Sequence, residues 1–419
     1  MTISYGLLGE CLTHSFSPRI HRLLGDYDYQ LIEIAPADLA IFLQQRSFQG
    51  LNVTIPYKKA VIPYCDALSP QAKRIGSVNT LVFDDAGRLV GHNTDYDGFK
   101  LMVQSSGIDM QGAKVLILGS GGASLTASIV SADLGARSII TVSRNGEVNY
   151  HNVYQLHADA NIIINATPCG MYPHNNEIPL KVNAFPACRG VLDMIYNPLR
   201  TNLALSANKQ HIPACCGLTM LVEQARRSAE LFLGTPIAAE RTAIINRQLS
   251  LELENIVLIG MPGSGKSSIG AALARRLQRK FVDFDLYISE KIGSTPEEII
   301  VTQGEEAFRI IESEAALEIG KQQGLVIATG GGTVTKAANM LALKQNGQIY
   351  FIERALEQLA TDGRPLSAAG AALAHLYQQR LPLYQQYADA VIANNDTLQQ
   401  VTQEILTLFQ GGKNENISY

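Results

Sequence analysis

The chain has 419 residues, which is long for one hydrophobic core, since single cores stop growing at about 250 to 300 residues. Its composition is 46% hydrophobic and 17% charged with 35 Gly and 16 Pro, which excludes a disordered, collagen-like or fibrous chain. The 34 Lys and Arg against 38 Asp and Glu give a formal net charge of -4, which argues against a nucleic-acid partner because no broad cationic surface is available.

Cysteine usage and the N-terminus bear on the compartment. No C-x-x-C spacing occurs among the cysteines, and a chain of this size needs no disulfides, so we expect reduced thiols and a cytoplasmic protein. The first residues lack a basic stretch followed by an apolar one, and no window of about 18 uninterrupted apolar residues occurs, so neither secretion nor membrane insertion is expected. The cysteines are Cys11, Cys65, Cys169, Cys188, Cys215 and Cys216.

Short β-branched or Leu-rich runs alternate along the chain with longer helical patterns, which is typical of parallel sheets covered by helices. The predicted fold class is therefore α/β. Three of the runs lead directly into glycine clusters, at residues 115–124, 256–268 and 325–333. Residues 241–255 look like a helix end followed by a short polar connection, so we place the main domain boundary near residue 250.

Polar clusters precede the first glycine cluster, and packing alone does not explain them. Ser15-Phe16-Ser17-Pro18 puts two hydroxyls on one side of an extended segment. Residues 52–58 end in Lys58, and residues 91–95 end in Asp95.

The first glycine cluster follows a predicted buried strand at 114–118 and leads into a predicted helix at 123–134. Such a turn lets the backbone approach a pyrophosphate, and the helix N-terminus supplies free N–H groups. The next strand, 138–143, ends at Arg144, where NAD sites usually present an acidic residue, and a guanidinium suits a 2′-phosphate. NADP is therefore favoured over NAD, although Arg144 could also be a solvated strand-end cation. The predicted cofactor residues here are Gly119, Ser120, Gly121, Gly122, Ala123, Ser143, Arg144 and Asn145.

The second glycine cluster, residues 260–267, matches G-x-x-x-x-G-K-[ST] in full, after a strand at 256–259 and before a helix at 268–277. In a P-loop the backbone N–H groups surround the phosphates, the lysine (Lys266) reaches the β and γ phosphates, and the serine (Ser267) binds Mg²⁺. The motif predicts a nucleoside triphosphate site but does not choose among ATPase, GTPase and kinase. The predicted nucleotide residues are Gly263, Ser264, Gly265, Lys266, Ser267 and Ser268.

Over residues 1 to about 248, the clusters above and four further segments, 76–80, 165–168, 193–198 and 217–224, resemble shikimate dehydrogenase in the expected order. The resemblance implies that Lys58 and Asp95 serve the proton transfer that accompanies hydride transfer from NADPH. It implies that Ser15 and Ser17 bind the substrate carboxylate and that Gly217 contacts the cofactor. Ring hydroxyls and carboxylate are then held by Thr54, Asn79, Tyr196 and Gln224. Read without the family, Lys58 is a surface cation, Asn79 a turn residue and Gln224 a solvated helix position.

Residues 253 to about 410 resemble shikimate kinase, through Phe281 to Asp285, Phe308-Arg309, residues 330–332, 363–366 and 380–384. The resemblance implies that Asp285 binds the substrate hydroxyls and takes a proton, and that Arg309 and Arg380 bind its carboxylate. Asp283 holds Mg²⁺ through water, and Arg364, on a lid, stabilises charge on the transferring phosphoryl group. The pocket is lined by Gly330, Gly331 and Gly332. The plainer alternatives are a helix ion pair for Arg309, with Glu305, Glu306 or Glu312, and a solvated position for Arg380.

The chain departs from both families in one respect each. Only Arg144 faces the expected 2′-phosphate, with Glu147 nearby, where NADP-using family members commonly carry a second cation. The segment before Arg364 lacks an additional arginine that shikimate kinases often have.

We therefore predict a bifunctional enzyme with NADP(H), ATP and Mg²⁺ as cofactors, which reduces 3-dehydroshikimate to shikimate and then phosphorylates shikimate. The rivals are an NAD-dependent quinate/shikimate dehydrogenase, a shikimate-sensing module, another small-molecule P-loop kinase and a nucleotide-gated switch. Ser17, where a threonine is expected for quinate, argues against the first. We expect a monomer or homodimer without a membrane or nucleic-acid partner. The predicted ranges are a substrate domain at 1–105 completed by 217–248, a Rossmann-like NADP domain at 106–216, a linker at 249–254, a P-loop kinase domain at 255–410 and a flexible tail at 411–419.

Overall fold

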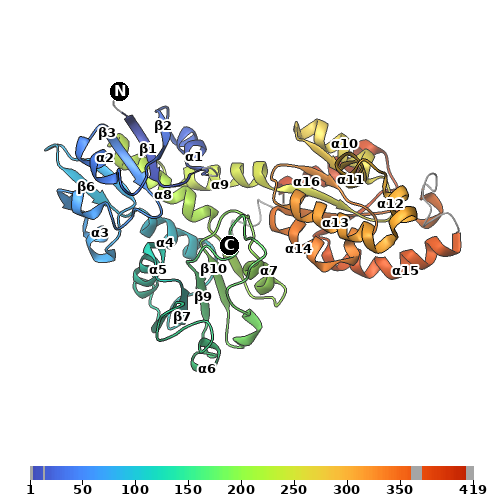
Figure 1. The fold of residues 1–419 in the computed structure, drawn as a ribbon, viewed down its shortest axis with the longest axis horizontal. Helices are drawn as coiled ribbons and strands as arrows, with labels where there is room; N and C mark the ends of the chain where they lie inside the picture. The colour runs from blue at the N-terminus through green and yellow to red at the C-terminus, as the bar shows by residue number, and fades with distance from the viewer. Residues whose placement is uncertain (1–2, 13–14, 360–369, 412–419) are drawn as a thin grey trace. The chain divides into compact units, whose positions relative to one another are not determined.

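The computed structural model describes residues 3–12, 15–359 and 370–411, and its elements are drawn in Figure 1. By its contacts the chain divides into two compact units. Of the described residues, the first unit holds those up to Asn197 together with Thr201–Gln248, and the second holds Pro198–Arg200 and those from Leu249 to Gly411. Except for Gly411, the predicted flexible tail lies outside the described residues.

The first unit begins with a six-stranded sheet in the order β2-β1-β3-β5-β6-β4. We expected parallel strands, but β5 runs antiparallel to both β3 and β6. The pairing of β5 with β6 follows from the short turn between them, because so short a turn can join only antiparallel strands. In this turn the Asp84 carboxylate accepts hydrogen bonds from the backbone N–H groups of Ala86 and Arg88. The strands are β1 (Ile3–Gly9), β2 (Tyr29–Glu33), β3 (Phe48–Val53), β4 (Ala67–Leu68), β5 (Thr80–Phe83) and β6 (Leu89–His92).

The second sheet of this unit has five parallel strands in the order β11-β10-β9-β7-β8. Strand β7, which lies between β9 and β8, is buried on both faces, because Val115 and Ile117 pack with α4 and α5 while Leu116 and Leu118 pack with α7 on the other side. The first glycine cluster therefore follows the carboxyl end of β7, and this is the end of a parallel sheet where ligands usually bind. The strands are β7 (Lys114–Leu118), β8 (Ser138–Val142), β9 (Ile162–Asn165), β10 (Gly190–Asp193) and β11 (Ala214–Cys216).

Helix α8 joins the two sheets of the first unit by packing against α4. Gly98 on α4 permits this approach, since a Cβ at that position would lie 2.6 Å from the Met220 carbonyl oxygen. The helices of this part are α1 (Ser17–Leu24), α2 (Leu39–Gln45), α3 (Pro70–Ile75), α4 (Asp95–Ser105), α5 (Gly122–Asp133), α6 (Val153–Leu156), α7 (Asn202–Asn208), α8 (Leu218–Leu233) and α9 (Glu240–Leu253), with 3-10 turns η1 (Ile62–Tyr64) and η2 (Val182–Ala184).

The second unit has a five-stranded parallel sheet in the order β13-β14-β12-β15-β16. Strand β12 again alternates between two cores: Val257 and Ile259 pack towards α11, α13 and α14, and Ile256 and Leu258 towards α10 and α16. The strands are β12 (Asn255–Ile259), β13 (Phe281–Asp283), β14 (Val326–Ala328), β15 (Gly347–Glu353) and β16 (Ala390–Ala393). The helices are α10 (Lys266–Leu277), α11 (Phe284–Ile292), α12 (Pro296–Gln303), α13 (Glu305–Gly320), α14 (Ala337–Asn346), α15 (Gly370–Tyr387) and α16 (Leu398–Gly411), with 3-10 turns η3 (Thr333–Thr335) and η4 (Leu356–Gln358).

The predicted linker at 249–254 is not a loop. Residues 249–253 are the last turns of α9, and β12 begins at Asn255. The helix continues because Ile245, Leu249 and Leu253 repeat every four residues and are all buried, at 1%, 0% and 6% exposure. Our expectation of a polar connection overlooked this apolar stripe.

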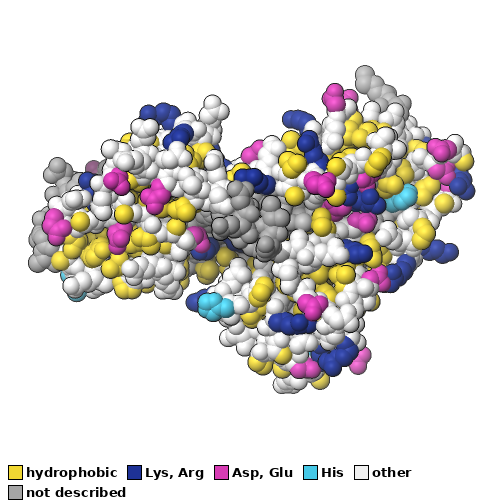
Figure 2. All heavy atoms as spheres, turned by 180° about the vertical axis from the view of Figure 1, so that it is seen from behind, with side chains coloured by type: hydrophobic (Ala, Val, Ile, Leu, Met, Phe, Trp, Pro, Cys, Tyr) yellow, Lys and Arg dark blue, Asp and Glu magenta, His cyan; other side chains and the backbone are white. Residues whose placement is uncertain are grey.

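Among the described helices, none combines the length and apolarity that a membrane crossing requires. On the face drawn in Figure 2, basic and acidic side chains are interspersed and apolar side chains lie between them.

Candidate active sites

The structure brings Lys58 and Asp95 together from two segments of the first unit. Lys58 follows β3, and Asp95 is the first residue of α4. The Lys58 Nζ donates to Asp95 Oδ2 at 2.5 Å, and the two side chains are 20% and 7% exposed. An ammonium held by a carboxylate at a partly open position can pass a proton to a bound ligand.

Ser15 and Ser17 lie at the start of helix α1. The backbone N–H of Ser17 donates to Ser15 Oγ at 3.2 Å, and Ser17 begins α1. Phe16, between them, packs against Tyr196 with ring centroids 5.4 Å apart. Burial raises the pKa of the Tyr196 hydroxyl. The hydroxyls that we expected at the substrate carboxylate therefore share one neighbourhood.

The amides of Asn79 and Gln224 also meet, across β5 and α8. Asn79 Nδ2 donates to Gln224 Oε1 at 3.5 Å and to Thr94 Oγ1 at 3.0 Å. Thr54 follows β3, and its backbone N–H donates to the Leu8 carbonyl at 2.9 Å. Asn79 is thus no isolated turn residue, and Gln224 is no solvated helix position.

The glycine-rich turn before α5 lies close to the Lys58 side chain. Gly119 has φ +102°, a conformation that favours glycine, and Gly121 precedes the first turn of α5. A Cβ on Gly122 would lie 2.9 Å from Ser77 Oγ and 3.7 Å from Lys58 Cδ, so the glycine lets the helix N-terminus approach the Lys58 side chain. Ser120 and Ala123 complete the turn around that N-terminus.

The other predicted cofactor residues lie at strand ends of the same sheet. Arg144 and Asn145 are exposed directly after β8, and the backbone N–H of Ser143 donates to the Val148 carbonyl at 3.1 Å. Gly217 precedes α8, and a Cβ there would lie 2.2 Å from the Met194 carbonyl oxygen. Gly217 is therefore required by packing, whatever it contributes to a cofactor.

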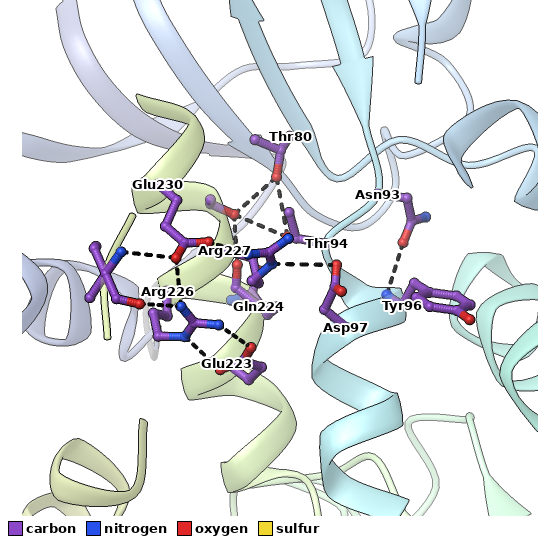
Figure 3. Close-up of polar contacts among 12 residues, drawn as sticks. Thr80, Asn93, Thr94, Tyr96, Asp97, Glu223, Gln224, Arg226, Arg227 and Glu230 are labelled. Atoms are coloured by element: carbon purple, nitrogen blue, oxygen red, sulfur yellow. Dashed lines mark hydrogen bonds and ion pairs between the residues drawn. The ribbon is translucent and has the colours of Figure 1, made fainter. Parts of the chain in front are cut away.

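A cavity of about 440 Å³ lies on the α8 side of the loop that carries Asp95. It is lined by Asn93, Thr94 and Asp97 from this loop and α4, and by Arg227 and Glu230 from α8. Figure 3 shows Arg227 between the two carboxylates, with Nε 3.8 Å from Asp97 Oδ2. The described lining of this cavity does not include Lys58 or Asp95.

In the second unit the P-loop has the conformation that its glycines allow. Gly263 and Gly265 have φ +81° and +94°. Lys266 Nζ donates to the carbonyls of Gly260 and Met261, at 2.9 and 2.8 Å, and Ser264 is fully buried. Ser267 Oγ donates to Asp283 Oδ2 at 2.5 Å, so the two groups expected at Mg²⁺ are adjacent. Ser268 continues α10.

Each glycine of the 330–332 cluster admits a different neighbour. A Cβ on Gly330 would lie 2.7 Å from Glu312 Oε1 and 3.4 Å from Asp285 Oδ1. A Cβ on Gly331 would lie 2.5 Å from Pro262 Cδ of the P-loop, and one on Gly332 would lie 2.2 Å from Arg309 Nη1. This glycine cluster therefore lies close to the P-loop, to Asp285 and to Arg309.

Glu312 is a site residue that we did not assign from the sequence. It is 1% exposed, accepts from Arg309 Nη1 at 2.8 Å and from Thr333 Oγ1 at 2.6 Å. Arg309 also donates to Glu305 at 2.9 Å, so the helix ion pairs exist, but Arg309 lies against Gly332 as well. Burial lowers the pKa of Arg309, but the carboxylates of Glu312 and Glu305 outweigh it and raise the pKa overall. The sequence signal available for Glu312 was that it follows Arg309 by three residues, a spacing at which two side chains on a helix can pair.

Arg380 is buried at 7% exposure on α15 and is not a solvated cation. Its neighbour Tyr384 donates to the Gly331 carbonyl at 2.6 Å, and burial raises the pKa of this tyrosine to about 12. Arg380 therefore lies beside the 330–332 cluster. The predicted lid residue Arg364 lies outside the described residues.

The described residues hold no group of three or more His, Cys, Asp or Glu side chains arranged for a metal. Mg²⁺ in a P-loop needs no such group, because it keeps several waters and binds substrate phosphates. The Ser267 and Asp283 oxygens fit this mode of binding.

Together these sites define a nucleotide-dependent dehydrogenase joined to a P-loop kinase. The comparisons with known proteins make both assignments specific. A family model described as "Shikimate dehydrogenase substrate binding domain" matches residues 7–81, and one described as "Shikimate kinase" matches residues 262–410. The chain belongs to the shikimate dehydrogenase family, in a fusion with a shikimate kinase domain.

Relatives and solved structures cover the first part of the chain. The NADP(+) shikimate dehydrogenase of Clostridium beijerinckii is 34% identical over 248 residues, which are 54% of this chain and 91% of the relative. The crystal structure of shikimate dehydrogenase 1 from Peptoclostridium difficile is 35% identical, with a TM-score of 0.55, over 59% of this chain and 97% of that one. A chorismate mutase/shikimate 5-dehydrogenase fusion protein from Clostridium acetobutylicum is 34% identical, with a TM-score of 0.56 and the same shares of the two chains.

Proposed function

We propose that this chain catalyses two consecutive reactions: the NADPH-dependent reduction of 3-dehydroshikimate to shikimate, and the ATP-dependent phosphorylation of shikimate to shikimate 3-phosphate. The observation that carries the proposal is that two separate families, matched in one chain, share shikimate as product and substrate. We infer a cytoplasmic enzyme, monomeric or homodimeric. The six free cysteines support a reducing compartment.

In the reduction, Lys58 and Asp95 act on the ketone oxygen. NADPH supplies the hydride when it is bound, with its phosphates at the N-terminus of α5 and its 2′-phosphate at Arg144. Lys58, held by Asp95 at 2.5 Å, donates the proton to the developing alkoxide. Gly122 lies close to the Lys58 side chain, so a cofactor bound at this loop and the proton donor would both be near the substrate ketone.

The remaining polar residues of the first unit orient the substrate. Ser15, Ser17 and Tyr196 bind the carboxylate, since the three lie around Phe16. Thr54 binds a ring hydroxyl. Asn79 and Gln224, whose amides face each other at 3.5 Å, bind the others. Such binding fixes which face of the ring receives the hydride.

In the phosphorylation, Asp285 orients a shikimate hydroxyl and takes its proton as the oxygen attacks the γ-phosphate. Arg309 and Arg380 bind the carboxylate, and Glu312 holds Arg309 in place through the 2.8 Å hydrogen bond. Lys266, which donates to the carbonyls of Gly260 and Met261 in the P-loop, would reach the β and γ phosphates when ATP is bound. Ser267 and Asp283 would hold Mg²⁺, which would neutralise charge on the phosphates, and Arg364 would stabilise charge on the transferring phosphoryl group.

A coupled assay on the intact chain tests the proposal. With 3-dehydroshikimate and NADPH we expect oxidation of NADPH and formation of shikimate, and after addition of ATP and Mg²⁺ we expect shikimate 3-phosphate, both identified by mass spectrometry. Lys58→Ala should slow the reduction by about 10² or more and leave phosphorylation of supplied shikimate intact, whereas Lys266→Ala should impair only the phosphorylation. If the chain binds shikimate but turns over neither substrate, the proposal is wrong and a sensing role takes its place.

A further inference from the structure

We propose that Thr94 is a positioning residue of the dehydrogenase site, which holds the Asn79 side-chain amide in one orientation for the substrate. The inference rests on the proposed function, since it takes Asn79 as a substrate-binding residue. Thr94 itself is 4% exposed and is the residue before Asp95.

The orientation of the Asn79 amide is fixed by two hydrogen bonds with Thr94. The Thr94 backbone N–H donates to Asn79 Oδ1 at 2.7 Å, and Asn79 Nδ2 donates to Thr94 Oγ1 at 3.0 Å. Because a backbone N–H can only donate, the oxygen of the amide must face it, which settles the choice between amide oxygen and nitrogen. The second Nδ2 hydrogen then points to Gln224 Oε1 at 3.5 Å, a long hydrogen bond that a substrate hydroxyl can replace.

While the Thr94 hydroxyl accepts from Asn79 Nδ2, its own proton has two acceptors within reach: Ser228 Oγ on α8 at 3.0 Å and Asn79 Oδ1 at 3.3 Å. Ser228 Oγ lies 3.0 Å from Thr94 Oγ1 and donates its single proton to the Gln224 carbonyl at 2.8 Å. Asn52 Nδ2 donates to Ser228 Oγ at 2.7 Å, which leaves one acceptor position for Thr94. Of this neighbourhood, Figure 3 labels Thr80, Thr94 and Gln224, which come from β5, the start of α4 and α8.

Thr80 also lies 3.0 Å from Ser228, but it has another acceptor for its proton. Thr80 Oγ1 donates to Asn79 Oδ1 at 3.2 Å. Every donor in the group then has an acceptor when Thr94 donates to Ser228. The Asn79 amide has partners on both its oxygen and its nitrogen, so rotating it would leave a buried polar atom unpaired. The same residue thus anchors the Asn79 amide and the start of the helix that carries Asp95.

The test compares two substitutions at one position in the full-length chain. Thr94→Val keeps the shape but removes the hydroxyl, so Asn79 Nδ2 loses its acceptor, whereas Thr94→Ser keeps the hydroxyl. For Thr94→Val we expect the KM for 3-dehydroshikimate to rise about tenfold, as expected for the loss of about one hydrogen bond. We expect Thr94→Ser to restore the value, and the KM for NADPH and the phosphorylation of supplied shikimate to stay unchanged in both variants.

A double-mutant cycle separates this role from a general structural one. In an Asn79→Ala background, Thr94→Val should change the KM by less than about twofold, because the residue it positions is gone. An equal rise in both backgrounds overturns the proposal. If Asn79→Ala itself leaves the kinetics unchanged, the proposed function of Asn79 fails, which is a different result. If Thr94→Val does not fold, Thr94→Ala removes the same hydroxyl with a smaller side chain, and an unchanged KM for 3-dehydroshikimate in that variant overturns the proposal.

Discussion

Gly332→Ala should impair shikimate binding by the kinase without unfolding it. The added Cβ would lie 2.2 to 2.4 Å from three guanidinium atoms of Arg309, closer than carbon and nitrogen can approach. Gly332 has φ -99°, which alanine adopts without strain, and the clashing group is the end of a flexible side chain. Arg309 must therefore move by about 1 Å and weaken its bonds to Glu312 and Glu305, and a misplacement of that size can cost about 10²-fold.

The assay is the initial rate of phosphorylation against shikimate concentration, with ATP saturating. We expect the KM for shikimate to rise by about 10- to 100-fold, the range for loss of a charge-assisted hydrogen bond. The rate of 3-dehydroshikimate reduction and the melting temperature should stay close to those of the unaltered chain. Gly411→Ala is the matched control, because nothing lies within 4 Å of its added Cβ. A KM that stays within about twofold would show that Arg309 does not act from its position over Gly332.

Three further perturbations address the first unit. Lys58→Ala should slow ketone reduction by about 10² or more, as expected for one general acid, while the exposed neighbour Lys59→Ala should have no effect, and equal rates would remove Lys58 from the chemistry. Arg144→Asp should shift the ratio of kcat/KM values from NADPH towards NADH, and an unmoved ratio would place the 2′-phosphate elsewhere. Burial lowers the pKa of His21 to about 3, so the folded state binds fewer protons than the unfolded state below about pH 6.5, and stability should be lost as the pH falls through this range. Urea unfolding followed by tyrosine fluorescence should show a loss of about 1 kcal/mol in the free energy of unfolding at pH 5.5, and this loss should be absent in His21→Phe; an equal loss in that variant would refute the assignment.

Features that depend on a few consecutive residues could be predicted from the sequence. The P-loop and the first glycine cluster are local: a buried strand, a glycine-rich turn and a helix N-terminus form a phosphate site from adjacent residues. The predicted helices at 123–134 and 268–277 begin one and two residues late, because the first helical turn is built from the loop residues themselves. The placement of Lys58 beside Asp95 was expected only through the family resemblance, and the structure has them 2.5 Å apart.

Other features depend on contacts between distant segments. The antiparallel pairing of β5 with β6 depends on one tight turn, and the continuation of α9 to Leu253 depends on what covers its apolar stripe. The roles of Glu312 and Thr94 follow from neighbours 21 and 134 residues away in the chain, Thr333 and Ser228. A glutamate or a threonine in a helical or turn pattern looks solvated until its partners are known. The sequence by itself determined the two chemistries, because phosphate loops and site motifs are short. Only the tertiary structure decided which buried polar groups hold those motifs in place, because a hydrogen bond between distant segments exists only once packing has excluded water from both partners.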